Sequence, residues 1–279
     1  MVSYILYLIG AGLVRLFPRH IAKGIAAVIA FTFFVSRPAI RRNVRRNFGS
    51  MERRVRSTFT VFYHFSHAAT DFLRLSFMTP EQLQSICTLT GKEHLDEALK
   101  EGRGAILFAP HLGPWELAGA YLPTIGYRLN TVAVEHPSRR VTRLFSGVRR
   151  RWGLVDYPLR ACAGELVRAL GKGEIAVLLI DRNFSKRGLR HRFLGAEAIV
   201  PTGHVVLSLR SGAPLLPCCC YYRGDERVEI VIGERVRTHE PATAVELADA
   251  CLARIEDFVR AYPDQWFAFD NLWPEDVHV

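Results

Sequence analysis

Apolar positions follow two different patterns along the chain. From about residue 100 onward, short apolar runs alternate with stretches in which apolar residues recur every three to four positions. The first pattern is typical of buried strands and the second of amphipathic helices. Their alternation predicts an α/β fold in which helices flank a central mixed sheet. Strands are expected at 104–110, 131–135, 154–157, 174–181, 214–222 and 228–232, and helices at 115–122, 139–151, 163–170, 202–210 and 242–262.

The beginning of the chain is apolar almost without interruption. Residues 4–17 contain one charge, Arg15, and residues 21–35 contain one, Lys23. Each segment is shorter than the ~20 apolar residues of a spanning helix. The uncharged start also argues against a secretory signal peptide. We therefore expect a helical, membrane-associating part over residues 1–60, followed by an α/β domain over 61–279.

A cluster of arginines follows these apolar segments. On a helix, Arg41, Arg42, Arg45 and Arg46 share one face, and Arg53, Arg54 and Arg56 come soon after. Apolar helices beside such a cluster are typical of proteins that lie on an anionic cytoplasmic membrane surface. The alternative is an ordinary helical hairpin of the core with a solvated basic face.

The overall charge is basic and is carried by arginine. The 279 residues include 37 basic and 27 acidic side chains, and five of the basic ones are lysine. Arginine forks bind planar anions such as phosphates and carboxylates. A nucleic-acid-binding protein is disfavoured, because the basic stretch 41–56 contains a single aromatic residue, Phe48.

Cysteines and histidines give no pattern typical of a metal site. Cys218, Cys219 and Cys220 form one run within an apolar segment, which suits a buried strand and reduced thiols in a cytoplasmic compartment. No Cys-x-x-Cys pair is present. A metal-dependent hydrolase would need ligands clustered near one another, whereas His136, His191 and His204 are scattered.

The stretch that carries candidate chemistry is His111-Leu-Gly-Pro-Trp-Glu116, directly after the strand expected at 104–110. The carboxyl end of a strand is the usual ligand-binding edge of an α/β sheet. Gly113 and Pro114 suit a turn into a helix, and this bend would let Glu116 reach the imidazole of His111. A carboxylate on one ring nitrogen raises the basicity of the other, which suits a general base acting on an alcohol. A structural histidine beside an acid is the alternative.

Motifs along nearly the whole chain resemble the bacterial lipid A biosynthesis (late) acyltransferase family, within the wider lysophospholipid acyltransferase-like superfamily. The His-x4-Glu stretch is similar to that family's His-x4-Asp/Glu motif. The segments 135–139 and 267–273 differ from typical lipid A enzymes, which leaves the acceptor open. The likeness continues through Arg41-Arg-Asn-Val-Arg-Arg-Asn47, Asp181-Arg-Asn, Gly188, Phe193-Leu-Gly195, Pro201-Thr-Gly203, Ser211-Gly-Ala-Pro-Leu-Leu-Pro217 and Tyr262-Pro-Asp-Gln-Trp-Phe267.

The resemblance implies that a fatty acyl group moves from an acyl thioester to a hydroxyl of a membrane glycolipid, at the cytoplasmic face of the bacterial inner membrane. The donor would be acyl carrier protein or coenzyme A, with no further cofactor and no metal. The acceptor would be a lipid A precursor, or else a phosphatidylinositol mannoside-like glycolipid, a lysolipid or an aminolipid.

The same resemblance gives roles to individual residues. His111 would be the general base and Glu116 its orienting partner. No Gly-x-Ser-x-Gly elbow is present, so direct transfer is favoured over a serine acyl-enzyme. Amides near Gly113, or an arginine, would stabilise the oxyanion. Substrate-binding residues are expected to be Arg149, Asp181, Arg182, Gly195, Thr202 and Gly203.

The basic helix expected at 139–151 suggests a protein partner. Arg139, Arg143 and Arg150 fall along one stripe at helical spacing, while Arg149 turns toward the site. We expect this stripe to face an acidic acyl carrier protein. The alternative is a solvated basic face that helps to hold the protein on the membrane.

Overall fold

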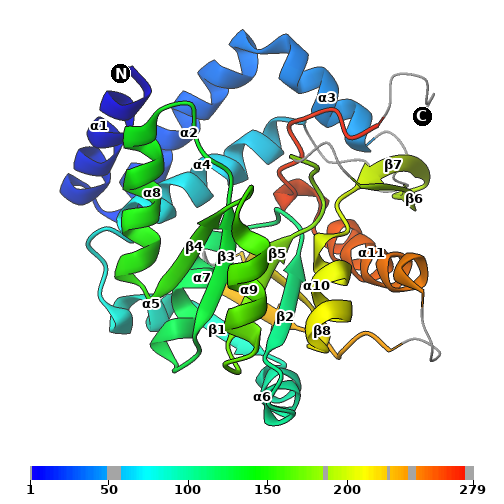
Figure 1. The fold of residues 1–279 in the computed structure, drawn as a ribbon. Coiled ribbons are helices and arrows are strands. Elements are labelled where there is room, and N and C mark those ends of the chain that lie inside the picture. Colours follow the sequence, from blue (N-terminus) through cyan, green and yellow to red (C-terminus); the bar gives the residue numbers. More distant parts are fainter. Residues whose placement is uncertain (1, 49–57, 185–187, 225–226, 238–242, 274–279) are drawn as a thin grey trace.

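The computed structural model describes residues 2–48, 58–184, 188–224, 227–237 and 243–273, and a seven-stranded sheet lies at its centre (Figure 1). The strand order is β1-β9-β8-β2-β5-β3-β4. A separate hairpin is formed by β6 (Leu189–Phe193) and β7 (Ala196–Val200). The sheet strands are β1 (Cys87–Thr90), β2 (Ala105–Ala109), β3 (Leu129–Ala133), β4 (Leu154–Pro158), β5 (Ile175–Leu179), β8 (Leu215–Tyr222) and β9 (Val228–Ile232).

The sheet is mixed, as the alternation predicts. The strands β8, β2, β5, β3 and β4 run parallel, whereas β9 is antiparallel to β8 and β1 is parallel to β9. All five residues of β2 are buried, because helices cover both faces of a parallel sheet. The α/β class and its central mixed sheet are therefore confirmed. The strand expected at 131–135 begins and ends two residues earlier, as β3.

Helices cover the sheet and extend beyond one end of it (Figure 1). The basic helix expected at 139–151 has those bounds in the structure. The pattern did not predict the elements between residues 58 and 100, or the hairpin β6–β7. The helices are α1 (Val2–Leu16), α2 (Arg19–Ser36), α3 (Pro38–Phe48), α4 (Thr58–Arg74), α5 (Pro80–Ile86), α6 (Lys92–Lys100), α7 (Trp115–Thr124), α8 (Arg139–Arg151), α9 (Cys162–Leu170), α10 (Gly203–Ser211) and α11 (Ala244–Ala261).

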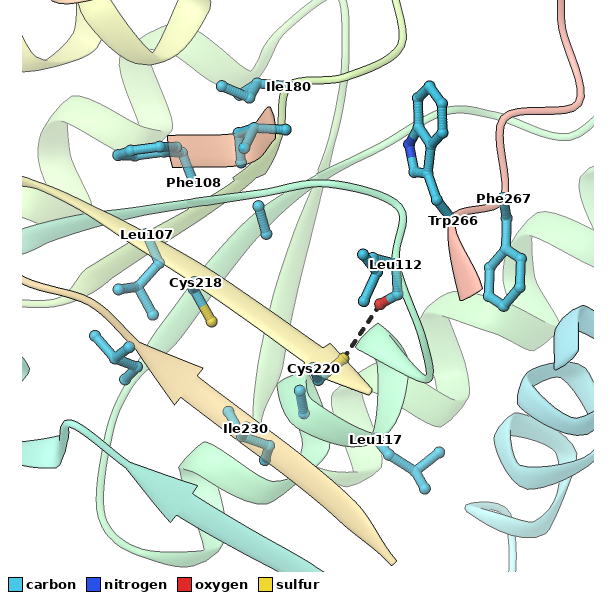
Figure 2. Close-up of a cluster of buried hydrophobic side chains, with 14 of the residues drawn as sticks. Leu107, Phe108, Leu112, Leu117, Ile180, Cys218, Cys220, Ile230, Trp266 and Phe267 are labelled. Atoms are coloured by element: carbon cyan, nitrogen blue, oxygen red, sulfur yellow. Dashed lines mark hydrogen bonds between the residues drawn. The ribbon is translucent and has the colours of Figure 1, made fainter. Parts of the chain in front are cut away.

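The cysteine run lies inside the core (Figure 2). Cys218, Cys219 and Cys220 are buried free thiols of β8, and burial raises the pKa of Cys218 to about 12. The Sγ atom of Cys220 lies 3.4 Å from the carbonyl oxygen of Leu112, which follows β2. The expected buried strand is confirmed, and its thiols are held in the unreactive protonated form.

The N-terminal helices carry a large exposed apolar surface. Among the described residues, α2 is the one helix long and apolar enough to cross a membrane. The second apolar segment therefore forms a longer helix than the sequence pattern suggests. Its side chains Val28, Ile29 and Phe31 are exposed, while the opposite side of α2 packs against α4. The arginines at positions 53, 54 and 56 lie outside the described residues.

A buried ionic network fastens α2 to α4. Asp71 of α4 accepts two hydrogen bonds from Arg19, at 2.8 and 2.7 Å. Lys23 Nζ lies 3.3 Å from the same carboxylate, and the Tyr222 hydroxyl donates to it at 2.7 Å. Burial opposes ionisation of Asp71, but Arg19, Lys23 and Tyr222 together lower its pKa below the ordinary value. The two charged residues in the first half of α2 thus point into the protein.

Replacing Asp71 with Ala should lower the free energy of unfolding by about 3–5 kcal/mol, because it leaves buried positive charge without its partner. The pKa of this carboxyl is depressed in the folded state, so its stabilising effect is present above pH about 4 and is lost as the pH falls through the folded pKa. Urea unfolding in detergent measures both effects. The control Glu165→Ala removes an exposed ion pair within α9 and should cost about 1 kcal/mol or less. Equal losses of unfolding free energy in Asp71→Ala and Glu165→Ala would show that the buried network stabilises the fold no more than an exposed ion pair does.

Candidate active site

His111 lies just beyond the carboxyl end of β2, as the motif predicts. The chain turns sharply there, because Gly113 has a φ of +59° and a Cβ on it would lie 2.2 Å from the carbonyl oxygen of Cys220. Leu112 forms an isolated antiparallel bridge with Trp266. The amide of Phe267 also donates to the carbonyl oxygen of His111 at 2.9 Å. The glycine turn and the C-terminal segment together fix the position of the imidazole.

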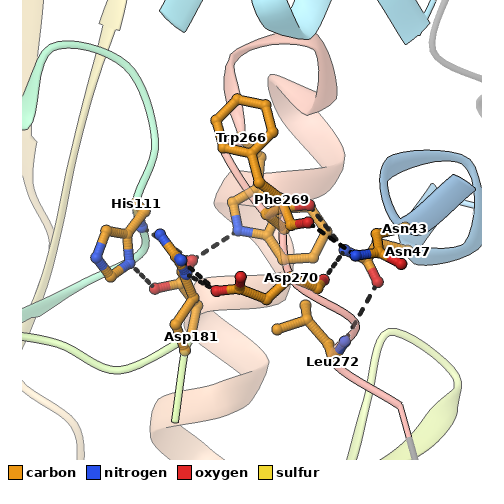
Figure 3. A network of polar contacts seen from close by, with 10 residues as sticks. Asn43, Asn47, His111, Asp181, Trp266, Phe269, Asp270 and Leu272 are labelled. Carbon is orange, nitrogen blue, oxygen red and sulfur yellow. Dashed lines mark hydrogen bonds and ion pairs between the residues drawn. The ribbon is translucent and has the colours of Figure 1, made fainter. Parts of the chain in front are cut away.

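Asp181 is the partner of the imidazole (Figure 3). The Nδ1 atom of His111 lies 2.6 Å from Oδ1 of Asp181, and the amide of His111 donates to Oδ2 at 2.9 Å. The register of β2 and β5 explains why these two side chains lie together. Ala109 of β2 pairs with Leu179 of β5, and His111 and Asp181 each follow these paired residues by two positions. Trp266 Nε1 also donates to Oδ2, at 2.7 Å. A hydrogen-bonded chain therefore runs from Trp266 through Asp181 to His111.

The environment of Asp181 favours its charged form. Its side chain is fully buried, and burial alone would raise its pKa. His111, together with hydrogen bonds from His111 and Trp266, instead lowers the pKa below the ordinary value. An ionised carboxylate beside Nδ1 places the ring proton on that nitrogen and leaves the lone pair on Nε2. The arrangement is that of a general base held in a defined tautomer.

Glu116 does not take the place that the motif suggests. It lies in the first turn of α7 and accepts two hydrogen bonds from Arg149 of α8, at 3.1 and 2.5 Å. Arg149 also lies 3.5 Å from Asp156 of β4. The expectation that Glu116 orients the imidazole is thus corrected, because Asp181 occupies that position. Arg149 is held between two carboxylates, which reduces its capacity to bind a free phosphate.

A large, mostly apolar cavity of about 850 Å³ opens beside His111. Its wall includes apolar side chains of α4, α8, α9 and α10 together with the ends of β3 and β5. Such a cavity suits a long hydrocarbon chain with a few polar groups at the reacting end. Six of the expected site residues line it: His111, Glu116, Arg149, Arg182, Thr202 and Gly203. Asp181 is buried behind His111.

The structure places Gly195, an expected substrate-binding residue, in a turn outside the described cavity wall. Leu194 and Gly195 form the two-residue turn between β6 and β7, with φ angles of 51° and 89°. Turns with two positive φ angles join twisted strands and favour glycine. The cavity wall, as far as the described residues form it, does not include Gly195. This glycine of the family-like motif therefore shapes the hairpin.

The polar groups near His111 are unequally available. The amide of Gly113 donates to the carbonyl oxygen of Gln265 at 2.8 Å, so it is already occupied. Arg182 lines the cavity, pairs with the exposed Asp270, and stacks over the Phe184 ring with 4.6 Å to the ring centroid. Of the two oxyanion donors expected from the sequence, an arginine therefore fits better than the Gly113 amide. The described residues contain no group of three or more His, Cys, Asp or Glu side chains placed to hold a metal ion.

The arginine-rich motif also contributes to the site, through its asparagines (Figure 3). Asn47 of α3 donates to the carbonyl oxygens of Ala268 and Asp270, both at 2.8 Å, and Asn43 donates to that of Phe269 at 3.1 Å. These bonds hold the segment that follows Trp266. The exposed arginines of α3 lie on the opposite side from the buried Asn47. Side-chain amides that bind distant backbone leave no local sequence signal.

Comparison with known proteins gives one family. The model described as bacterial lipid A biosynthesis acyltransferase matches residues 1–275. The chain is similar to phosphatidylinositol mannoside acyltransferase of Mycolicibacterium smegmatis, with 27 % identity over 97 % of this chain and 91 % of the relative. It is 28 % identical to the protein of the same name from Mycobacterium tuberculosis, over 67 % of this chain and 60 % of the relative. The lipid A biosynthesis acyltransferase of Haemophilus influenzae is 23 % identical, over 69 % and 60 %.

Proposed function

This chain belongs to the bacterial lipid A biosynthesis acyltransferase family, and on that premise we propose that it moves a fatty acyl group from an acyl thioester to a hydroxyl of a membrane glycolipid. The family membership confirms the resemblance drawn from the motifs and makes the protein an acyltransferase. The observation that supports this reaction type is the series of hydrogen bonds from Trp266 through Asp181 to His111, at the wall of an apolar cavity of about 850 Å³.

The proposed reaction is a direct transfer. Nε2 of His111 removes the proton of the acceptor hydroxyl while that oxygen attacks the thioester carbonyl. The carbon–sulfur bond of the tetrahedral intermediate then breaks, and the departing thiolate takes the proton from the imidazolium. Asp181 stabilises the imidazolium throughout, and Trp266 holds Asp181 in position. The products are the ester and the free thiol, so no external oxidant, reductant or cofactor enters the balance.

Arg182 is the proposed stabiliser of the oxyanion. It lines the cavity, and its side chain is 19 % exposed, so that it combines access to the ligand with a partly desolvated setting. A positive charge near a developing oxyanion is worth most where water is excluded. Its partner Asp270 is 61 % exposed, so this ion pair is screened and loses little when the guanidinium turns to a ligand.

The acceptor that we favour is a phosphatidylinositol mannoside-like glycolipid, and a lipid A precursor is the second candidate. The match to the mycolicibacterial phosphatidylinositol mannoside acyltransferase spans nearly all of both chains, whereas the Haemophilus match spans 60 % of that relative. Both lipids combine a sugar hydroxyl with an anionic phosphate, and both suit a basic, membrane-facing enzyme.

The transfer itself can be tested with purified full-length protein in detergent. Palmitoyl thioesters of acyl carrier protein and of coenzyme A are each offered with a phosphatidylinositol mannoside or a lipid A precursor, and products are identified by mass. We expect one donor and one acceptor class to give a product heavier by a single acyl ester. Formation of free fatty acid alone, with every acceptor, would contradict acyl transfer to a glycolipid.

We propose that α1 and α2 hold the protein on the cytoplasmic leaflet. The apolar face of α2 supplies burial, and the arginines of α3 supply attraction to anionic headgroups. Attraction of this kind is screened by salt, whereas apolar burial is not. High salt should therefore release the full-length protein from membranes only in part.

Replacing Ile29 and Phe31 together with Asp should shift the protein toward the soluble fraction, because both side chains lie on the exposed face of α2. Deleting residues 1–36 has the same aim but also removes Arg19 and Lys23 from the Asp71 network. Membrane flotation measures the distribution. Val245→Asp, at an exposed apolar position of α11, is the control and should leave it unchanged. An unchanged distribution of the double variant would place the attachment elsewhere.

The exposed arginines of α8 give a test of the donor. Arg139 and Arg143 are exposed, while Arg149 of the same helix lines the cavity. Reversing the first two to Glu should raise the KM for acylated acyl carrier protein several-fold and leave kcat with a short acyl thioester nearly unchanged. The control Arg254→Glu changes an exposed charge on α11. An unchanged KM together with weaker membrane binding would assign α8 to the lipid surface.

A further inference from the structure

The cavity beside the imidazole has an apolar rim. Wall residues such as Leu166, Ile180 and Leu207 are buried. Among the residues that the structure describes, five large apolar side chains of the same wall are instead 36–45 % exposed, which places them at its opening. Exposed apolar groups that gather at one place on a protein surface typically mark an interaction site. These residues, which we call the rim, are Phe65, Val134, Leu159, Phe184 and Val206.

The rim surrounds the reacting end of the cavity. Val134 follows β3, Leu159 follows β4 and Phe184 follows β5. These three strands run parallel, so the segments that follow them lie at the same edge of the sheet, the one that also carries the imidazole. Phe65 of α4 and Val206 of α10 complete the rim. The exposed apolar groups are therefore concentrated where the substrates must enter.

A row of packed aromatic rings joins the rim to α2. Phe34 of α2 packs on Phe62 of α4 with 5.3 Å between ring centroids, and Phe62 packs on Phe269 at the same spacing. Phe269 in turn lies 5.0 Å from the rim residue Phe65. Phe33, on the exposed side of α2, also packs on Phe62, at 6.1 Å. All four spacings are typical of packed aromatic pairs, so α2 and the rim belong to one continuous apolar layer.

Arginines lie beside both ends of this layer. Arg37 and Arg41 lie over phenylalanine rings of α2, with 5.6 and 5.1 Å between the guanidinium carbon and the ring centroid. Near the rim, Arg160 and Arg210 are exposed, and Glu135 is an exposed acid beside them in the loop after β3. Arginine stems can lie along apolar surface while their guanidinium groups bind lipid phosphates. An apolar layer flanked in this way suits an anionic leaflet.

We propose that the rim enters the hydrocarbon of the cytoplasmic leaflet, so that the acyl chains of the substrates pass from the membrane directly into the cavity. The inference rests on the proposed function, because it takes the cavity to be the site of acyl transfer. It goes beyond attachment through α1 and α2, since it fixes which side of the α/β domain faces the lipid. Exposing a long acyl chain to water is strongly unfavourable, and a cavity that opens into the leaflet avoids this exposure.

The test places a fluorescent label at the rim of the full-length protein, reconstituted in vesicles of equal parts phosphatidylglycerol and phosphatidylcholine. Val206→Cys is made together with Cys162→Ser, because the other five cysteines are buried, and is labelled with a nitrobenzoxadiazole group. Lipids that carry a nitroxide on the acyl chain quench labels lying in the hydrocarbon. We expect the label at position 206 to lose more than half of its emission. Leu159→Cys provides a second rim position if the first variant does not fold.

Two matched labels complete the design. Phe31→Cys, on the exposed face of α2, should be quenched as strongly as the rim label. Val245→Cys, at an exposed apolar position of α11, should keep its emission. Quenching of the label at 245 to the same extent would mean that the lipid does not select the rim, and would overturn the inference.

The failure of this inference can be told apart from the failure of the proposed function. Unquenched labels at 206 and 159, beside a quenched label at 31, would show that the rim faces water and would leave the attachment and the acyl transfer standing. A change of rim emission on adding acylated acyl carrier protein, without any effect of the vesicles, would assign the rim to that protein instead. The transfer assay with purified protein tests the reaction itself and does not depend on the rim's orientation.

Discussion

Replacing His111 with Ala should lower kcat about 10²–10⁴-fold, because a positioned general base contributes an effect of that size. The imidazole lies at the end of β2, in the wall of the cavity, with Nδ1 on Asp181. Its removal leaves in place the two hydrogen bonds that Asp181 accepts from the Trp266 indole and from the backbone amide of residue 111. We therefore expect the variant to keep its fold and its acyl binding while it loses turnover.

Steady-state transfer to the glycolipid acceptor, together with thermal unfolding, measures this outcome. His94→Ala is a matched control, since His94 belongs to α6 and is absent from the described cavity wall. It should retain the wild-type rate. If purified, folded His111→Ala kept more than half of the wild-type kcat, the general-base mechanism would be wrong.

The second large effect is expected at Asp181. Asp181→Asn keeps the size of the side chain but removes the charge that stabilises the imidazolium and fixes the tautomer of His111. We expect kcat to fall by about 10² or more, with the KM for the donor nearly unchanged, since Asp181 is buried behind His111 and does not line the cavity. Trp266→Phe, which removes one of the two donors to Oδ2 and leaves the amide of His111, should cause a smaller fall.

Glu116 provides the comparison that separates the two possible partners of His111. Glu116→Gln weakens the ion pair with Arg149 but leaves the contact between His111 and Asp181 intact. Kinetics of the two amide variants, measured side by side, should therefore show a much larger loss of kcat for Asp181→Asn. The reverse order would mean that Glu116 is the functional partner of His111, as the His-x4-Glu motif alone suggests.

Much of the framework is predictable from local patterns, and the partner of His111 is not. The helix at 139–151 has its expected bounds because its apolar residues recur at helical spacing. His111 stands out because it follows a short apolar strand. Asp181 also follows such a strand, but its meeting with His111 depends on β2 and β5 being neighbours in the sheet. Strand order is a long-range property that a short motif does not contain. The motif therefore indicated Glu116, which is close to His111 in the sequence, as its partner.

The C-terminal segment shows a second limit of local patterns. Trp266 stands in a segment that resembles the family, yet its contact with Asp181 arises from the bridge to Leu112 and from the bonds that Asn47 makes. The bridge to Leu112 and the bonds of Asn47 join residues more than 150 positions apart. Gly195 shows the same limit, since a glycine at a tight turn and a glycine at a ligand look alike in sequence, and the structure places it at the turn between β6 and β7.

The most direct measurement is lipid mass spectrometry of a strain that lacks this protein, complemented with wild type, His111→Ala or Asp181→Asn. Without the protein, one membrane glycolipid should lose the mass of a single acyl chain. Wild type should restore that mass, and the two variants should not, although they accumulate to the same level in the membrane. A glycolipid profile that is unchanged by the deletion, or restored by His111→Ala, would contradict the account.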